Sequence, residues 1–108
     1  MPKPFPSSKM IALDYDGTYT ADPEMWLAFV ILARQRGHNV LLVTMRYPNE
    51  GNSICEQLKL AVNGIIFTSR KAKVPYMEAL CVKVDMWIDD QPRWLLNDSA
   101  FVNQTPSA

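Results

Sequence analysis

The sequence predicts an α/β domain, a doubly wound parallel sheet of about four strands in three layers, with helices on both faces. Two observations support this fold class. Apolar runs of strand length alternate along the chain with segments of helical periodicity, and the joints between them are short. Parallel strands joined in this order need right-handed crossovers, which place the helices on the faces of the sheet.

The predicted elements follow one another without an internal repeat. Apolar runs that stop at a polar or glycine-containing turn indicate buried strands, expected at residues 10–13, 40–43, 65–67 and 84–88. The first helix is expected to have Asp22 as its N-cap, Pro23 in its first turn and Gly37 at its end. Further helical segments are expected at residues 52–60, 75–81 and 92–96.

The 108 residues suffice for one domain, because domains commonly hold about 100–150 residues. Residues 1–8 contain three prolines and two serines and are expected to form a loose N-terminal segment. A single folded domain is expected over residues 9–97, followed by a polar C-terminal tail over residues 98–108.

Hydrophobic residues make up 48% of the chain and charged residues 20%, which is the balance of a globular protein. Eleven basic residues match eleven acidic ones, so the net charge gives no reason to expect steering toward nucleic acid or an anionic membrane. The longest uncharged apolar run, residues 25–33, is far shorter than the roughly 20 residues of a membrane-spanning helix. We therefore expect a cytoplasmic protein without membrane contact, with Cys55 and Cys81 as reduced, packed thiols.

Polar side chains follow the predicted strands at their carboxyl ends, where ligands bind in open parallel sheets. They are Asp14, Asp16, Thr44, Thr68, Ser69, Asp89 and Asp90. If the strands are neighbours, three or four carboxylates converge on a small volume, and their repulsion requires a cation. Carboxylate and carbonyl oxygens suit Mg²⁺, which keeps waters and accepts a substrate phosphate. The sequence therefore predicts a Mg²⁺ site, and it leaves open whether Asp89 or Asp90 contacts the ion directly.

Several residues at the same edge have the chemistry that phosphoryl transfer needs. A carboxylate beside a divalent cation can attack phosphorus and form an acyl phosphate that water later hydrolyses. Hydrogen-bond donors must then stabilise the charge on the phosphoryl oxygens. The candidates are the Thr44 hydroxyl, the backbone amides of Gly17 and Thr18, and the ammonium of Lys71 or Lys73. Arg46, two residues after Thr44, is a candidate for contact with a substrate phosphate or carboxylate.

Residues 10–18, an apolar strand followed by Asp-Tyr-Asp-Gly-Thr, resemble the first motif of the haloacid dehalogenase (HAD) superfamily phosphatases. Residues 41–44 resemble the second motif of that family, and residues 87–90 resemble its acidic fourth motif. The resemblance extends from about Lys9 to Trp94. It implies a Rossmann-like core and a Mg²⁺-dependent phosphatase that works through an aspartyl-phosphate intermediate.

The same resemblance implies roles for individual residues. Asp14 would be the nucleophile, and Asp16 would be the general acid and base, with its backbone carbonyl on the metal. Asp89 and Asp90 would complete the Mg²⁺ site. The residues expected to contact the phosphate are Tyr15, Gly17, Thr18, Thr44 and Arg46. For the lysine of the third motif Lys73 is favoured over Lys71, because Lys73 immediately precedes the helix start at Val74-Pro75.

The chain leaves no room for a cap domain at the usual insertion points. Only residues 19–22 separate the first motif from the first helix, and the second helix is expected to follow Thr44 almost directly. A capless site is open, so the expected substrate is a nucleotide, a sugar phosphate, a polynucleotide end or a phosphoprotein. A homo-oligomer is one way in which such a site would be covered.

Other functions remain open at this stage. A phosphotransferase would use the same residues. A phosphorylation-responsive receiver domain also combines an aspartate, Mg²⁺, a threonine and a lysine, although here residues 67–69 end the third strand without an acid. A regulatory or binding module that forms phosphoaspartate with little turnover is the remaining alternative.

The remaining aromatic and polar residues are expected to have mainly structural roles. We expect Trp26, Phe29 and Trp87 in the core, and Arg93 and Trp94 at the border of the site opening. His38 is expected in a solvated turn. Asp85 is expected to meet water or a lysine.

Overall fold

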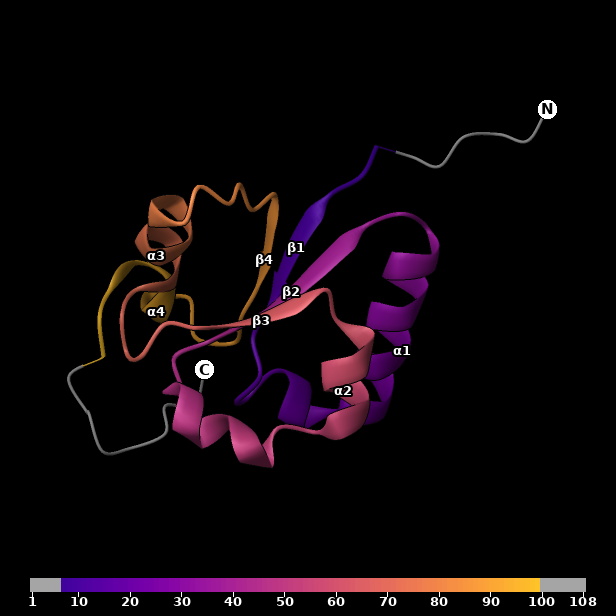
Figure 1. Cartoon of the computed structure of the whole chain (residues 1–108), viewed down its shortest axis with the longest axis horizontal. Helices are drawn as coiled ribbons and strands as arrows, with labels where there is room; N and C mark the ends of the chain where they lie inside the picture. The colour runs from indigo at the N-terminus through magenta and orange to yellow at the C-terminus, as the bar shows by residue number, and fades with distance from the viewer. Residues whose placement is uncertain (1–6, 100–108) are drawn as a thin grey trace.

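Four parallel strands form one sheet in the order β3-β2-β1-β4 in the computed structural model, which describes residues 7–99 (Figure 1). They are β1 (Met10–Leu13), β2 (Asn39–Thr44), β3 (Gly64–Phe67) and β4 (Met86–Ile88). This confirms the predicted α/β domain with its four-stranded, all-parallel sheet. The last strand begins two residues later than expected, at Met86. Just before it, the Asp85 carboxylate accepts a hydrogen bond from the backbone N–H of Met10 (2.9 Å).

The helices are α1 (Pro23–Gln35), α2 (Glu56–Ala61), α3 (Lys73–Ala79) and α4 (Arg93–Leu96), with 3₁₀ turns η1 (Tyr19–Ala21) and η2 (Pro48–Ser53). The predicted N-cap is confirmed, since the Asp22 carboxylate accepts a hydrogen bond from the backbone N–H of Met25 (3.2 Å). The linkers after β1 and β2 form η1 and η2 and hold no separate cap domain within the described residues.

The prediction of a helix over residues 52–60 is wrong in its first half. Residues 48–53 form η2, the chain is extended at Ile54 and Cys55, and α2 begins only at Glu56. Tertiary contacts explain the break: Ile54 is buried in the core, and the Cys55 backbone N–H donates to the Tyr15 hydroxyl at 3.3 Å. These contacts fix an extended backbone that the periodicity of the sequence does not reveal.

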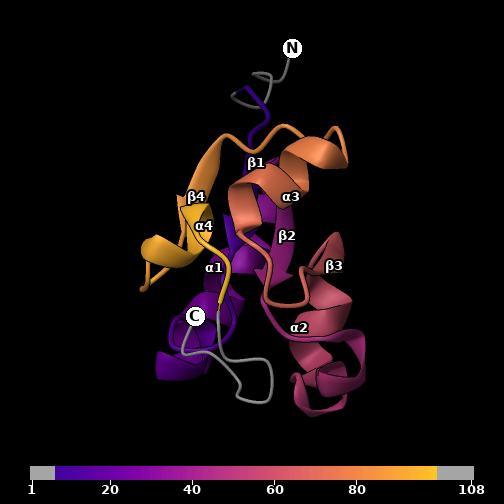
Figure 2. The same cartoon turned by 90° about the vertical axis from the view of Figure 1, so that its left-hand side faces the viewer.

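Helices pack against both faces of the sheet (Figure 2). Ile11 and Leu13 of β1 belong to a core cluster with buried residues of α1 and α2, whereas Ala12 packs on the opposite face with Met77 of α3. This alternation follows from the period of two in a strand. Complete burial of a side chain such as Leu13 contributes about 1.5–3 kcal/mol to the stability of the fold.

The path of the chain reverses at β1. The chain runs outward from β1 through β2 to β3 and then returns, by way of α3, to pair β4 with the other side of β1. The register pairs Leu13 with Leu42 on one side and with Ile88 on the other, so the residues that follow β1 and β4 leave the sheet side by side. In open α/β sheets, the carboxyl ends of strands at such a reversal are where ligands bind.

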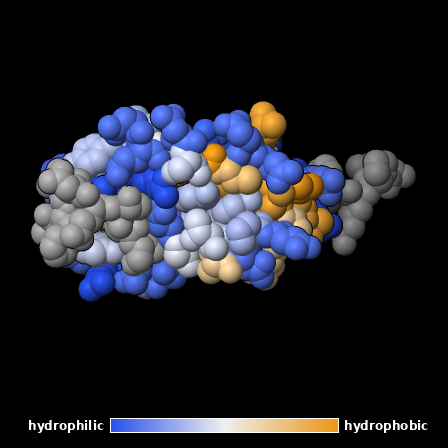
Figure 3. All heavy atoms as spheres, turned by 90° about the horizontal axis from the view of Figure 1, so that it is seen from below, coloured by the Kyte–Doolittle hydropathy of each residue, from blue (hydrophilic) through white to orange (hydrophobic). Residues whose placement is uncertain are grey.

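Some apolar side chains and one cysteine lie on the surface. Met25, Ile31 and Leu32 of α1 are exposed, and Figure 3 shows apolar residues gathered toward the end of the molecule near the N-terminus. Cys81 is also exposed, so its prediction as a packed thiol is wrong; α3 ends at Ala79 and the backbone of Cys81 has a left-handed φ of 59°. Cys55 is half-buried.

The two ends of the predicted domain make specific contacts. Ser8 donates from its hydroxyl to the carbonyl of Gly37, and Asp98 accepts from the backbone N–H of Ala72 at 2.7 Å. Residues 1–6 of the expected loose segment and residues 100–108 of the expected tail lie outside the described residues. Within residues 7–99, no helix has the length and apolar character needed to cross a membrane.

Candidate functional site

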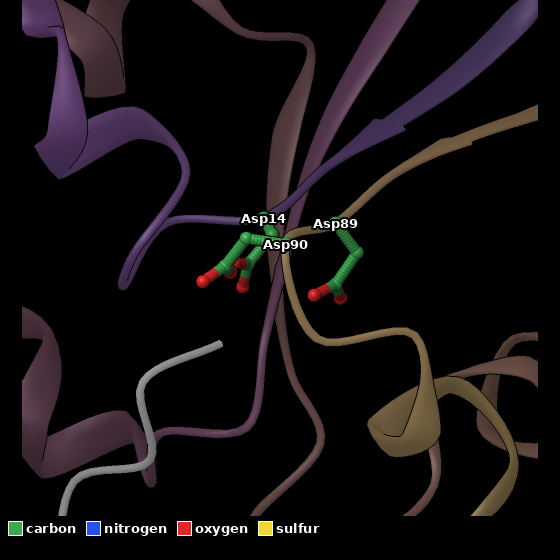
Figure 4. Close-up of side chains that lie close together, drawn as sticks. All are labelled: Asp14, Asp89 and Asp90. Atoms are coloured by element: carbon green, nitrogen blue, oxygen red, sulfur yellow. The ribbon is translucent and has the colours of Figure 1, made fainter.

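Three carboxylates meet at the carboxyl ends of β1 and β4 (Figure 4). Asp14 directly follows β1, and its backbone N–H donates to the carbonyl of Ile88 (3.0 Å), which extends the ladder by one residue. Asp89 and Asp90 follow β4. One oxygen from each carboxylate lies within 4.8 Å of the others. Asp14 is buried, Asp90 is exposed, and Asp89 is half-buried as a whole residue although its side chain is only 2% exposed. We call these three residues the aspartate cluster.

Lys73 supplies the positive charge beside the cluster. Its ammonium lies 2.8 Å from Asp14 Oδ1 and 2.7 Å from Asp89 Oδ2, and the residue is fully buried. As the first residue of α3, Lys73 reaches the sheet edge from the helix start. Lys71, the other candidate lysine, is 67% exposed and lies 3.8 Å from Asp98 instead. Of the two candidates, only Lys73 is brought to the aspartate cluster.

The Thr18 hydroxyl links two members of the cluster. It lies 3.0 Å from Asp14 Oδ2 and 3.2 Å from Asp90 Oδ1, and it accepts the backbone N–H of Asp90 at 3.1 Å. A hydroxyl has one hydrogen, so it donates to one carboxylate at a time. For Gly17 and Thr18, the sequence suggested the backbone amides as donors and not the Thr18 hydroxyl. The Gly17 amide is already engaged, since it donates to Thr20 Oγ1 at 2.9 Å.

Burial makes the charge on Asp14 costly. The pKa of Asp14 is raised to about 8, mainly because burial removes the carboxylate from water; Lys73 opposes the rise, and the neighbouring Asp89 adds to it. With all three carboxyls ionised, the single ammonium of Lys73 would leave the cluster with a net charge of −2. A divalent cation would balance that charge and favour the ionised form of Asp14.

The aspartate cluster has the composition of a hard-cation site. Its donors are all carboxylate oxygens that follow the ends of two adjacent strands, and such ligands suit Mg²⁺ or a similar ion. Ligands at the Mg²⁺ distance of about 2.1 Å lie at most about 4.2 Å apart. The three oxygens of the cluster, all within 4.8 Å of one another, are therefore spaced on the scale of a magnesium site.

Asp16 lies beside the cluster but is not part of it. Both of its carboxylate oxygens accept from the guanidinium of Arg46, with Nε 2.8 Å from Oδ2 and Nη2 2.7 Å from Oδ1. The sequence placed Asp16 in catalysis and at the metal through its backbone carbonyl, and it placed Arg46 at the substrate. The pairing of these two side chains was not expected from the sequence.

Thr44 and Tyr15, both expected at the phosphate, are buried. Thr44 ends β2 next to β1, and its hydroxyl accepts the backbone N–H of Arg46 at 3.2 Å. The ring of Tyr15 stacks on Tyr19 with 5.5 Å between centroids, and its hydroxyl lies 3.5 Å from the carbonyl of Ser53. The Tyr15 side chain is therefore occupied in the core, which leaves its backbone as the part available to a substrate.

The sequence did not indicate that Arg70 connects the loops that follow β2 and β3. Arg70 is 3% exposed, donates to the carbonyl of Met45 at 2.6 Å and pairs with Glu50 at 3.0 Å. It thereby ties the loop after β3 to the loop after β2. No local pattern around Arg70 indicates this contact, because it depends on the left-handed backbone of Arg70 itself, with φ of 70°.

A pocket of about 310 Å³ opens next to the cluster, lined by Gly17, Thr18, Ala21, Trp26, Ile88, Asp89 and Asp90. Trp26 was expected in the core; it is half-buried, packs against the core and also forms part of this wall. Phe29 and Trp87 are likewise half-buried against the core. Trp94, expected at the opening, does not line this pocket and instead stacks under Arg93 at 4.9 Å.

Comparisons of the chain with protein-family models, with curated proteins and with solved structures found no match. A function therefore has to be inferred from the side chains described above.

Proposed function

We propose that the chain is a Mg²⁺-dependent phosphatase of the HAD type, with the three-layer core of that superfamily, and that Asp14 is its nucleophile. One observation carries the proposal: a buried lysine bridges a buried aspartate at one strand end and a second carboxylate at the neighbouring strand end, and a third carboxylate lies close to both acids. Buried carboxylates that converge in this way are costly unless they serve a cation or a reaction.

The reaction would proceed in two displacements. An oxygen of Asp14 attacks the phosphorus of a phosphomonoester, the P–O bond to the leaving group breaks, and an aspartyl-phosphate forms. Water then attacks that phosphorus, which releases inorganic phosphate and returns the Asp14 carboxylate. Asp16 is the proposed group that gives a proton to the leaving oxygen in the first step and takes one from water in the second.

The neighbouring residues have defined parts in this scheme. Lys73 balances negative charge on Asp14 and on the phosphoryl group, and the Thr44 hydroxyl is a proposed donor to a phosphoryl oxygen. Mg²⁺, held by the aspartate cluster and by the backbone carbonyl of Asp16, would offset the repulsion between the carboxylates and the phosphate. Phosphomonoesters in general are the proposed substrates, and the cytoplasm is the proposed location.

The decisive test replaces the nucleophile. Asp14→Asn should abolish Mg²⁺-dependent release of phosphate from an aryl phosphate, since the amide cannot form the acyl phosphate. Asp85→Asn is the matched control: Asp85 is an exposed carboxylate at the other end of β4, and asparagine keeps the acceptor for the Met10 backbone N–H. Retained turnover in the Asp14 variant would refute the assignment.

The same experiment separates the phosphatase from its main alternative. A regulatory module that forms phosphoaspartate with little turnover would accumulate a stable, hydroxylamine-sensitive phosphate on Asp14 and release little of it. Steady turnover that depends on Asp14 excludes that alternative.

A further inference from the structure

Arg46 holds Asp16 by both carboxylate oxygens. The two contacts, 2.8 Å from Nε and 2.7 Å from Nη2, form the bidentate pairing that a planar guanidinium makes with a carboxylate. Each side chain is only 12% exposed. Such a pair fixes the position and also the plane of the Asp16 carboxylate, which otherwise stands in a turn next to Gly17, a residue with a left-handed φ of 87°.

Arg46 is itself anchored on its far side. Nη1 donates to the carbonyl of Glu50 at 2.8 Å and to Ser53 Oγ at 2.6 Å, both in η2. The guanidinium also lies over the Tyr15 ring, 5.2 Å from its centroid. Donors on all three guanidinium nitrogens therefore have partners within the protein. This leaves the side chain poorly suited to grip a substrate anion, the role that the sequence suggested.

We propose that Arg46 is a positioning residue that acts through Asp16, an inference that rests on the proposed phosphatase function. A carboxylate offers about four lone-pair positions, so two remain for a water or a leaving oxygen when Arg46 occupies the other two. Proton transfer needs a heavy-atom distance of about 2.6–3.2 Å, and an error of 1 Å in placement can cost roughly 100-fold in rate. Arg46 keeps Asp16 within that tolerance by anchoring it to η2.

A double-mutant cycle tests this role. Arg46→Lys keeps the charge but loses the planar fork, so kcat for an aryl phosphate should fall by about 100-fold while KM stays within about twofold. In an Asp16→Asn background the Arg46→Lys substitution should cause almost no further loss of kcat, because the carboxyl group that the Arg46 guanidinium positions is already absent. Arg34→Lys is the matched control, since Arg34 is an exposed arginine of α1 that donates to the carbonyl of Ala61 at 2.8 Å and lies outside the proposed site.

The contrary outcomes are distinct. A large rise in KM with unchanged kcat would mean that Arg46 binds the substrate. Equal losses of kcat in the wild-type and Asp16→Asn backgrounds would mean that Arg46 does not act through Asp16. Either result overturns the inference while turnover by the wild-type protein still upholds the phosphatase. Absence of Mg²⁺-dependent turnover in the wild-type protein would refute the phosphatase and this inference together.

A second variant guards against a loss of folding. If Arg46→Lys fails to give the wild-type circular dichroism spectrum, Arg46→Ala can be assayed with added guanidinium ion. Partial recovery of kcat in the Arg46→Ala protein, and none in the Asp16→Asn, Arg46→Ala double variant, is the expected result. Equal response of both proteins to guanidinium would contradict the proposed role.

Discussion

Lys73 lies between Asp14 and Asp89, with its ammonium within 2.8 Å of one carboxylate and 2.7 Å of the other. All three side chains are at most 2% exposed, so the ammonium is surrounded by protein rather than by water. The lysine joins the carboxyl ends of β1 and β4 to the first turn of α3. The Lys73 ammonium therefore connects the aspartate cluster to the first turn of α3.

Replacement of Lys73 should destabilise the fold. Lys73→Met removes the charge at similar volume and leaves two buried carboxyls without a cation, at a cost of about 3–5 kcal/mol in the free energy of unfolding. Urea unfolding of the metal-free protein measures this. Lys71→Met is the matched control and should change stability by less than about 0.5 kcal/mol, because Lys71 is 67% exposed. Equal effects of the two substitutions would contradict the buried bridge.

Asp14 should make the metal-free protein less stable as the pH rises. Its pKa is raised from 3.8 to about 8 in the folded state, so between these values the folded protein binds more protons than the unfolded chain. The contribution of protonated Asp14 to the free energy of unfolding is fully present below the pKa of the unfolded chain. It is lost as the pH rises through the pKa of the folded protein. The melting temperature of the wild type relative to Asp14→Asn should therefore fall across this range in EDTA. A constant difference would contradict the raised pKa.

Binding of Mg²⁺ should release a proton. At about pH 7, below the raised pKa, Asp14 is mostly protonated in the metal-free protein, and a metal ligand must be ionised. Affinity for Mg²⁺ should therefore increase as the pH rises toward 8. Calorimetric titration in buffers of different ionisation enthalpy measures the proton count, and Asp14→Asn should remove the release. Binding of the same strength at all pH values would count against Asp14 as a ligand.

The elements that carry the aspartate cluster were predictable from the sequence, whereas several of its contacts were not. The apolar runs that end at Leu13 and Ile88 are short and bounded by acids, so the strand ends and the acids beside them follow from local pattern. Lys73 was favoured over Lys71 because it immediately precedes the helix start expected at Val74-Pro75, and in the structure α3 begins at Lys73 itself.

Contacts between loops escaped prediction. The pairing of Arg46 with Asp16 depends on the course of η2, where tertiary contacts of Ile54 and Cys55 override a helical pattern. Similarly, the Thr18 hydroxyl reaches Asp90, 72 positions away in the sequence, only because β1 and β4 are neighbours. Residue type and spacing carry no information on side-chain direction at that range.

Removal of the Thr18 hydroxyl should weaken Mg²⁺ binding more than it weakens the fold. Thr18→Val keeps the volume but leaves Asp14 and Asp90 without their shared hydrogen-bond partner, at 3.0 and 3.2 Å in the native protein. Groups that orient metal ligands typically account for about 10–100-fold in metal affinity. Calorimetric titration should show a loss of that size for Thr18→Val and near-native affinity for Thr18→Ser, which restores the hydroxyl. If valine binds Mg²⁺ as tightly as threonine, the hydroxyl does not orient the ligands and the cluster is positioned by the strand ends alone.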